Sequence, residues 1–354
     1  MGKNRERMMN MLRKPWHQWF AQAGYGMMAH FGLYSLLGGE WAGRRVSSYA
    51  EWIQSAMAIP NREYEKLAQA FNPVFFDADQ WISLCKKAGM KYFVFTAKHH
   101  DGFAMFRSRA DAYNVVDATP FGRDIVGELA ESCRKYQMPF GLYYSQELDW
   151  HHPHGGGYDR QEESAGVSWD NSWDFPDRQH KDFSICFEEK IKPQVEELLT
   201  GYGDLCLFWF DVPHTITKAQ SLELSQLVKH YQPHCLINSR IGNGAYDYVS
   251  LNDNEYPARK QVENLDPNSL GGFKISPYDL YETPGTMNSS WGYKYFDNAY
   301  LTGEEIVRRR EKLNSLGVNY LLNVGPDPLG RIPSFCRDAL LKAAPGRRKI
   351  VSNG

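Results

Sequence analysis

Several short apolar runs of this chain end abruptly in side chains that can bind polar ligands or transfer protons. The clearest of these runs end in or lead directly to the following residues: His30, Lys98, His99, His100, Asp101, Glu147, Asp211 and Arg240. Imidazole rings can hydrogen-bond a polar ligand, and a carboxylate can act as a nucleophile or as a general acid or base. The sequence therefore predicts a polar site that is assembled from the ends of several strands.

Eight apolar runs are candidates for the strands that would carry these side chains. They lie at residues 24–35, 91–102, 140–150, 204–214, 235–240, 247–255, 278–283 and 319–327. In a barrel of parallel strands the interior is filled by side chains, so ligands bind at the carboxyl ends of the strands. Parallel neighbours also need crossovers of about a dozen residues or more, usually helical. The spacers between the eight runs are long enough for such crossovers.

Four of the spacers have helical periodicity. Residues 77–90 repeat apolar side chains at helical spacing, and residues 124–137 and 303–317 show the same pattern. Residues 182–199 predict a fourth helix, kinked or divided at Pro193. Alternation of buried strands with amphipathic helices predicts an α/β fold, a (β/α)8-like TIM barrel.

Composition and charge narrow the classes of function. The 354 residues are 42% hydrophobic and have a formal net charge of −2, which leaves no basic surface for nucleic acid. No apolar run reaches the roughly 18 to 20 residues that span a membrane. Residues 1–20 are basic but lack the apolar segment of a secretory signal, and the six scattered cysteines are expected to be buried thiols. We therefore expect one domain over residues 1–354, in the cytoplasm, with no membrane or nucleic-acid partner.

Aromatic residues gather near the predicted strand ends. Five of the ten tryptophans lie there or in neighbouring loops: Trp41, Trp52, Trp150, Trp209 and Trp291. An indole ring suits the apolar face of a sugar. Most glycosidases use two carboxyl groups, and Asp211, at the end of the run LCLFWF, is the best first candidate. Residues 151–176 are rich in glycine and aspartate and are expected either to wall the pocket or to be disordered.

The chain resembles a known family over most of its length, from about residue 19 to residue 333. The stretches AHFGLYS, FNPVFFDADQWISLCKKAGMKYFVFTAKHHDGF, YYSQELDW, LFWFDV, INSR, ETPGTMNSSWGY and LLNVGPDPLGRIP resemble those of the α-L-fucosidases of glycoside hydrolase family 29, in the same order. The resemblance implies an exo-acting retaining enzyme that removes terminal α-L-fucosyl residues from fucosylated glycans or glycosides.

The same resemblance implies roles for individual residues. It puts Asp211 in the role of the nucleophile that attacks the anomeric carbon and forms a covalent fucosyl-enzyme. The positions that match the fucose-binding stretches of the family are His30, Trp41, Glu51, Trp52, His99, His100, Tyr144, Trp209 and Arg240. Trp291 is expected to contact the C5 methyl group of the sugar.

The general acid/base stays open between two glutamates. Glu255 follows the Asp247-Tyr248 pair, after which family members tend to place this group, although the intervening stretch is longer here. Glu282 belongs to the better matched stretch ETPGTMNSSWGY, but it could instead hold the sugar or the loop. We favour Glu255 over Glu282, with Asp253 third. The pKa of the acid should be raised by burial or by a nearby negative charge.

His99, His100 and Asp101 also admit a metal-binding interpretation. Neighbouring residues of a strand point to opposite faces, so two ligands of one metal would need the strand to bend there. The chain has no HExxH or comparable ligand spacing elsewhere. We therefore expect no metal and no other cofactor.

After the stretch GPDPLGRIP only about twenty residues remain, whereas family members usually continue into a C-terminal β-sandwich. We therefore expect a bare catalytic barrel, and a homo-oligomer in which another copy covers the surface left open. The alternatives are a retaining glycosidase for another fucose-like sugar and a noncatalytic fucose-binding protein. The presence of Asp211 argues against the second alternative.

Overall fold

Eight parallel strands form the central sheet of the computed structural model, which describes residues 13–158 and 168–346. The strands are β1 (Tyr25–Ala29), β4 (Phe93–Lys98), β5 (Phe140–Ser145), β6 (Leu207–Asp211), β7 (Leu236–Ile237), β8 (Val249–Ser250), β9 (Tyr281–Thr286) and β10 (Val318–Val324). Their order in the sheet is β7-β6-β5-β4-β1-β10-β9-β8. Asn238, just after β7, and Tyr248, just before β8, form an isolated parallel bridge, so the sheet curls round on itself. The predicted (β/α)8-like barrel is confirmed, with each of the eight strands lying within or across a predicted run.

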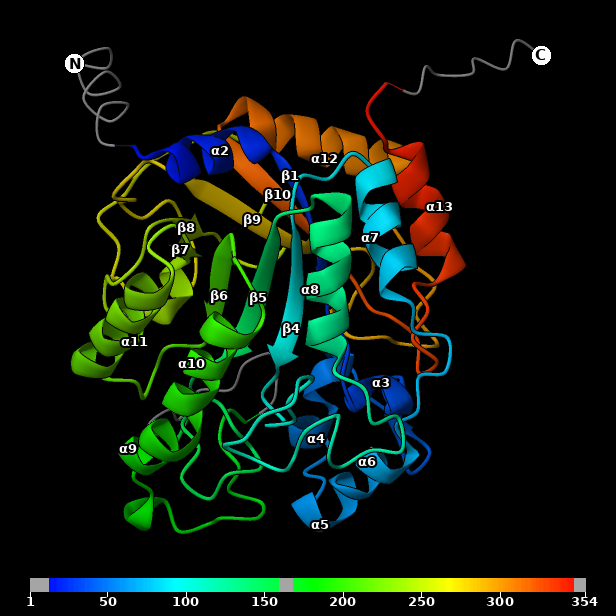
Figure 1. Ribbon diagram of the computed structural model, residues 1–354, viewed down its shortest axis with the longest axis vertical. Coiled ribbons are helices and arrows are strands. Elements are labelled where there is room, and N and C mark those ends of the chain that lie inside the picture. Colours follow the sequence, from blue (N-terminus) through cyan, green and yellow to red (C-terminus); the bar gives the residue numbers. More distant parts are fainter. Residues whose placement is uncertain (1–12, 159–167, 347–354) are drawn as a thin grey trace.

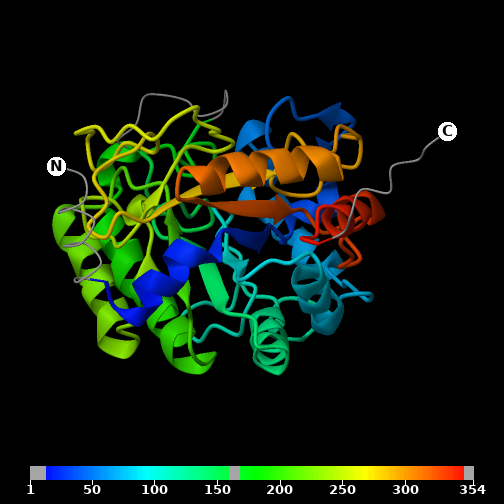
Figure 2. The ribbon, with the colours of Figure 1, turned by 90° about the horizontal axis from the view of Figure 1, so that it is seen from above.

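Helices surround this barrel (Figures 1 and 2). They are α2 (Pro15–Ala23), α3 (Tyr34–Leu37), α4 (Ile53–Ala56), α5 (Asn61–Tyr64), α6 (Lys66–Ala70), α7 (Ala78–Lys87), α8 (Ile125–Tyr136), α9 (Phe183–Cys186), α10 (Lys192–Gly201), α11 (Lys218–Tyr231), α12 (Gly303–Ser315) and α13 (Ser334–Lys342). Short 3₁₀ turns cover Ala50–Trp52, Arg178–His180 and Ser239–Ile241, and a two-stranded antiparallel ribbon pairs β2 (Glu40–Trp41) with β3 (Arg44–Arg45). In the described residues no helix is long and apolar enough to cross a membrane.

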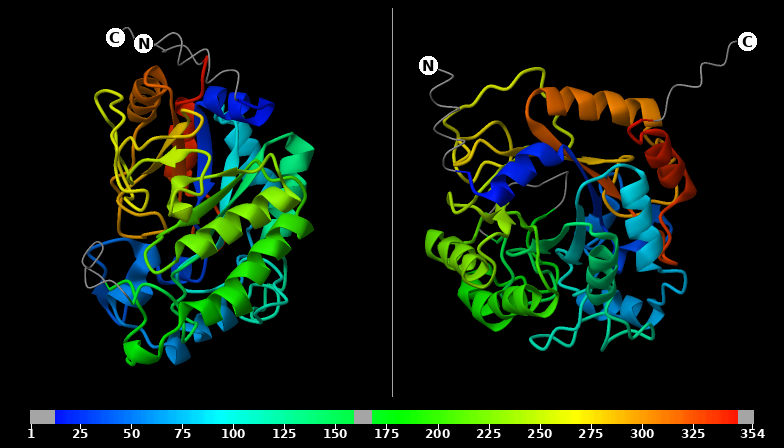
Figure 3. Two further views of the ribbon diagram at one scale, coloured as in Figure 1. Left: turned by 90° about the vertical axis from the view of Figure 1, so that its left-hand side faces the viewer. Right: turned by 45° about the horizontal axis from the view of Figure 1, so that its top comes forward.

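The four predicted helices are present. Asp77 and Asp124 begin α7 and α8, because each carboxylate accepts a hydrogen bond from the backbone N–H three residues later. The fourth helix is divided as expected, but the division is a turn of π-helix at Phe187–Ile191, and Pro193 lies in the first turn of α10. The sequence prediction missed α11, which Thr217 begins through a capping box with Gln220, and which packs beside α10 (Figure 3).

Large apolar side chains fill the barrel from its amino end. Helix α2 lies across that end and inserts Phe20, whose ring centroid is 4.6 Å from that of Tyr248. Above it, Tyr92, Leu207 and Trp209 are buried in the same cluster. The interior is therefore a packed core rather than a channel, and a ligand can reach the barrel only at the carboxyl ends of the strands. Figure 1 shows the short helices α3 to α6 beyond those ends.

Candidate active site

A pocket opens at the carboxyl ends of the strands. It is lined by Met28, His30, Tyr49, Glu51, Trp52, His99, His100, Tyr143, Trp169, Trp209, Asp211, Val212, Arg240, Asp253, Leu270 and Trp291. Ten of the residues predicted from the sequence are in this set: His30, Glu51, Trp52, His99, His100, Trp209, Asp211, Arg240, Asp253 and Trp291. The strand ends therefore converge on one site, as the sequence predicted.

Asp211 is the last residue of β6, and its carboxylate is held from two sides. Arg240 Nη1 donates to Oδ1 at 3.1 Å, and the Tyr143 hydroxyl donates to Oδ2 at 2.8 Å. His100 Nε2 lies 3.9 Å from the same Oδ2. Burial raises the pKa of Asp211 above its usual value and the charge of Asp253 adds to this, whereas Arg240 and the Tyr143 hydrogen bond oppose it.

The chain leaves Asp211 through an unusual backbone conformation. Val212 has a φ of 57°, in the left-handed region that a β-branched residue rarely adopts. The Asp211 backbone N–H donates to Gln146 Oε1 at 2.7 Å, which fixes the strand end just before the turn. Such strain is commonly kept where it aims a functional side chain.

Arg240 connects two carboxylates of the pocket. Its Nη1 contacts Asp211, and its Nη2 donates to Asp253 Oδ1 at 2.6 Å and to the Leu251 carbonyl at 3.0 Å. The guanidinium carbon lies 4.7 Å from the ring centroid of Trp209. Asp211 and Asp253 therefore share one cation, and the side chain of Asp253 is the more exposed, at 29% against 13%.

Three histidines line the pocket in the neutral form. Burial lowers the pKa of His30 to about 4 and brings the pKa values of His99 and His100 well below their usual range. His30 Nδ1 is 2.7 Å from Asn323 Oδ1, and His100 Nδ1 is 2.7 Å from the Ser145 hydroxyl. Neutral imidazoles can donate to or accept from sugar hydroxyls according to their tautomer.

Contrary to the alternation expected of neighbouring strand residues, His99 and His100 both line the pocket. Strand β4 ends at Lys98, so both histidines lie in the turn beyond it, and their ring centroids are 4.1 Å apart. Alternation applies only within a strand. Even so, no cluster of three or more potential metal ligands from His, Cys, Asp and Glu occurs in the described residues.

Glu51 faces the pocket from the 3₁₀ turn Ala50–Trp52. Its Oε2 accepts from the Gly292 backbone N–H at 2.8 Å and from the Ser290 hydroxyl at 3.2 Å, while Oε1 is buried without a partner among the described residues. Burial raises the pKa of Glu51 to about 7. This carboxyl oxygen, in a pocket that Trp291 also lines, can bind a hydroxyl group of a ligand.

Four predicted residues lie outside the pocket lining. Tyr144 points outward from β5, and its hydroxyl donates to Gln194 Oε1 at 2.7 Å; the neighbouring Tyr143 points inward in its place, as alternation along a strand requires. Trp41 is half-buried on the ribbon β2–β3. Glu255 is half-buried and accepts from the backbone N–H groups of Asn252 and Gly272.

Glu282 lies beneath the floor of the pocket. It is fully buried near the start of β9 and accepts from Trp209 Nε1 at 2.9 Å and from the Tyr92 hydroxyl at 2.7 Å. Burial raises its pKa to about 7. The ring of Trp209 lines the pocket, whereas Glu282 does not. The carboxyl group of Glu282 therefore contacts the side chain that forms the floor.

Sequence reasoning missed six residues of the lining: Met28, Tyr49, Tyr143, Trp169, Val212 and Leu270. Strand alternation could have identified Tyr143. Trp169 comes from the predicted loop 151–176, of which residues 159–167 lie outside the described part of the chain. Within the described part of this loop, Trp169 forms part of the pocket wall, and its ring centroid lies 5.6 Å from that of Trp52.

A buried ionic cluster supports the turn that carries the histidines. Asp149 Oδ2 lies 3.2 Å from Lys98 Nζ and 2.9 Å from Lys190 Nζ, and all three side chains are almost fully buried. Lys190 Nζ also forms an ion pair with Asp111 Oδ2 at 2.6 Å and donates to the Gly102 carbonyl at 3.1 Å. Lys190 belongs to the π-helical turn Phe187–Ile191, so this irregular turn directs its ammonium group toward the residues that follow β4.

Comparison with known proteins identifies the family. The family model described as alpha-L-fucosidase matches residues 3–344. The chain belongs to the α-L-fucosidase family. It is therefore a glycoside hydrolase, and the predicted activity on α-L-fucosides is confirmed at this level.

Solved structures and characterised sequences of the family agree with this assignment. Unliganded α-L-fucosidase AlfC from Lactobacillus casei is 55% identical, with a TM-score of 0.87, over 93% of this chain and 96% of that one. The enzyme from Vibrio sp. strain EJY3 is 34% identical with a TM-score of 0.83, over 93% of this chain and 54% of that one. Plasma α-L-fucosidase of Homo sapiens is 30% identical over 347 residues, which are 89% of this chain and 64% of the human protein.

Proposed function

We propose that this enzyme releases terminal α-L-fucosyl residues by double displacement with retention of configuration, and that Asp211 is the nucleophile. The proposal rests on the position of Asp211 at the end of a buried strand. Its carboxylate accepts hydrogen bonds from Arg240 and Tyr143. A nucleophilic carboxylate must be ionised, and both of these donors favour the ionised form against the effect of burial.

In the first step Asp211 attacks the anomeric carbon, the glycosidic C1–O bond breaks, and the acid gives a proton to the leaving oxygen. The neutral His30, His99 and His100, together with Glu51, supply hydrogen-bonding groups for the ring hydroxyls. Trp291 and Trp52 present aromatic surface for the apolar parts of the sugar. In the second step the same acid, now a base, activates water to release fucose.

For the acid/base we now favour Asp253, the third of the three candidates from the sequence. Asp253 lines the pocket with Asp211 and shares Arg240 with it, so the two carboxyl groups face the same space. Neither Glu255 nor Glu282 lines the pocket: Glu255 Oε2 accepts from two backbone N–H groups, and Glu282 lies beneath Trp209. A proton donor must come within hydrogen-bond reach of the leaving oxygen, which lies inside the pocket.

The proposed substrates are fucosylated glycans, including those in which fucose is α1,6-linked to N-acetylglucosamine. One and the same mutant of AlfC has been solved in complex with Fuc-α1,6-GlcNAc and with 4-nitrophenyl-α-L-fucopyranoside, and AlfC itself has been solved with α-L-fucose product. We further propose a single catalytic domain, a cytoplasmic location and a homo-oligomeric state. A light-scattering mass equal to one chain would remove the last of these.

The test is hydrolysis of p-nitrophenyl α-L-fucoside by the wild type and by Asp211→Ala, with EDTA in parallel reactions. Wild type should release nitrophenol with or without EDTA, and Asp211→Ala should be nearly inactive while keeping its thermal unfolding temperature. Azide should restore turnover of the variant and give a β-fucosyl azide. Release by neither protein would favour a noncatalytic fucose-binding protein, and preferential hydrolysis of a galactoside with the same ring configuration would favour another glycosidase.

The acid/base assignment is tested by comparing three alanine variants, at Asp253, Glu255 and Glu282. Loss of the acid should slow substrates with poor leaving groups much more than activated aryl fucosides, and azide should yield an α-fucosyl azide. Asp253→Ala should be the variant with both signatures. The assignment fails if Glu255→Ala or Glu282→Ala shows them and Asp253→Ala does not.

A further inference from the structure

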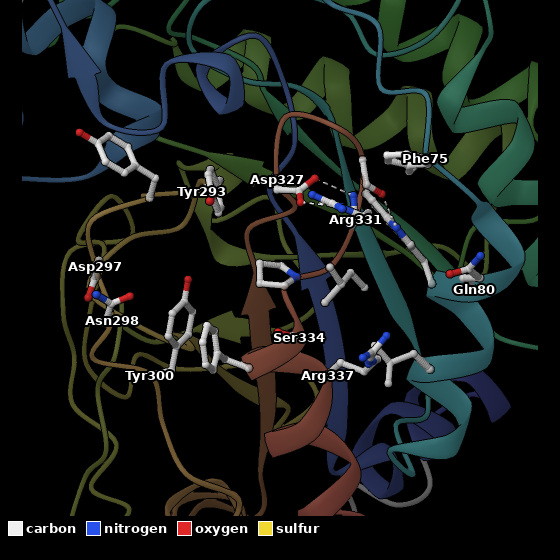
Figure 4. A pocket seen from close by; sticks show the side chains of 17 residues that line it. Phe75, Gln80, Tyr293, Asp297, Asn298, Tyr300, Asp327, Arg331, Ser334 and Arg337 are labelled. Atoms are coloured by element: carbon white, nitrogen blue, oxygen red, sulfur yellow. Dashed lines mark hydrogen bonds and ion pairs between the residues drawn. The ribbon is translucent and has the colours of Figure 1, made fainter.

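A second cavity lies on the outside of the barrel, between α7, the start of α13 and the loop at residues 293–300 (Figure 4). Its volume is about 490 Å³, within the usual range of ligand sites. It shares no lining residue with the active-site pocket. The two are connected through the chain, because Trp291 lines the active site and Tyr293, two residues later, lines the second cavity.

Aromatic rings with large exposed faces line this cavity. Phe335 is 66% exposed, Phe75 is 56% exposed and Tyr295 is 46% exposed, three of the most exposed large hydrophobic side chains among the described residues. The rings of Phe335 and Tyr300 are stacked, with centroids 5.9 Å apart and planes inclined by 19°. Exposed rings gathered in a concavity are typical of a surface that binds something.

Some polar groups of the cavity bond to neighbouring groups of the protein, and others do not. Asp327 and Arg331 neutralise each other through a contact of 2.8 Å, and Asp297 accepts from the Ser289 backbone N–H, so these groups hold the loops in place. In contrast, no hydrogen bond within the described residues engages the Tyr293 hydroxyl, the Tyr300 hydroxyl or the side chain of Asn298. Figure 4 shows Tyr300 and Asn298 on the same wall of the cavity.

We propose that this cavity is a second carbohydrate-binding site, which holds an N-acetylglucosamine residue of a glycan without taking part in catalysis. A pyranose ring offers an apolar face for the Phe335 and Tyr300 rings, and its hydroxyl and acetamido groups match uncharged donors and acceptors such as those of Asn298 and Tyr293. The lining carries two carboxylates, Asp297 and Asp327, and two guanidinium groups, Arg331 and Arg337, so its formal charges cancel, which favours a neutral ligand. The identity of the sugar rests on the proposed function, because N-acetylglucosamine is the sugar next to fucose in the proposed substrate.

The probe is N,N′-diacetylchitobiose, which contains no fucose. Its binding is measured by saturation-transfer NMR and by titration, in the presence of enough L-fucose to saturate the active site. Chitobiose should bind the wild type saturably, and Phe335→Ala should weaken this binding by roughly three- to tenfold, the value of one ring contact. Leu222→Ala is the matched control, because Leu222 is 50% exposed on α11 and does not line the cavity.

Two further measurements separate the site from catalysis. Phe335→Ala should hydrolyse p-nitrophenyl α-L-fucoside as the wild type does. With fucosylated chitobiose as substrate, its KM should rise by the same factor as the dissociation constant, with kcat unchanged.

The proposal is overturned if chitobiose does not bind the wild type, if L-fucose displaces it, or if Phe335→Ala binds it normally. A lower molar mass of Phe335→Ala, with sugar binding unchanged, would instead assign the aromatic surface to contact between copies of the chain. Because chitobiose carries no fucose, these outcomes are independent of whether the enzyme hydrolyses fucosides.

Discussion

Replacing Asp149 by asparagine should destabilise the folded protein by about 3–5 kcal/mol, because it removes the shared counter-ion of two buried ammonium groups. Lys98 and Lys190 lie 3.2 and 2.9 Å from the carboxylate, and their side chains are 0% and 4% exposed. Burial favours the neutral form of the Asp149 carboxyl group, but the charges of the two lysines have the larger effect and hold the pKa of Asp149 below its usual range. Lys190 would keep Asp111, whereas Lys98 would be left with the Leu148 carbonyl at 3.4 Å and the ring of Tyr144.

The magnitude has an upper limit, because the folded variant can release a proton from Lys98. Neutralising a lysine of ordinary pKa costs about 4.6 kcal/mol at pH 7 and about 1.9 kcal/mol at pH 9. Burial already lowers the pKa of Lys98. In the variant the unfolded chain binds a proton that the folded chain does not, so the stability of the variant rises with pH relative to wild type. The deficit should therefore shrink between pH 7 and pH 9.

The assay is thermal unfolding at both pH values. For 354 residues the unfolding entropy is about 0.7 kcal/mol/K, so a loss of about 3–5 kcal/mol lowers the midpoint by about 4–7 °C at pH 7. Asp79→Asn is the control, because it breaks the exposed pair with Lys135 and should cost less than about 1 kcal/mol. If the deficit of Asp149→Asn equals that of the control, or stays constant from pH 7 to pH 9, Asp149 does not stabilise the buried charge of Lys98.

Three further outcomes are expected. Tyr143→Phe should move the acidic limb of kcat/KM to higher pH, since losing the hydrogen bond to Asp211 raises the pKa of a group that must be ionised; an unchanged limb contradicts this. Glu282→Gln should gain stability relative to wild type between pH 5 and pH 8. The pKa of the Glu282 carboxyl group is about 7 in the folded protein, above its value in the unfolded chain, so wild type loses stability as the pH rises through this range. An equal difference in melting temperature at the two pH values would contradict this. Gly102→Ala should lower the free energy of unfolding by at least about 2 kcal/mol in chemical denaturation, because φ is +76° and the added Cβ would lie 2.3 Å from Asp149 Oδ1. A denaturation midpoint equal to that of wild type would show that the turn relaxes to accept the methyl group.

Local sequence patterns predicted most of the fold because they report directly on burial and capping. The runs that became β4, β5 and β6 are buried throughout, so their apolar character is continuous and their ends are marked by polar residues. The helices α7 and α8 carry both an apolar face and an aspartate cap. Helix α11 was missed although its Thr217 and Gln220 form a capping box, because only three of its fourteen residues are buried and its apolar pattern is weak.

The residue types that reach the mouth of the barrel could be predicted from the sequence, since the ends of parallel strands must meet at one edge of the sheet. The sequence placed Asp211, His30 and Arg240 in one site without any knowledge of their distances. Tertiary structure decided which of several candidate carboxyl groups share that site. Glu255 and Glu282 were the first candidates from the sequence, yet the backbone turn after β8 and the packing of Trp209 direct them elsewhere, and Asp253 lines the pocket with Asp211. Such choices depend on contacts between residues far apart in the chain, and no local pattern encodes them.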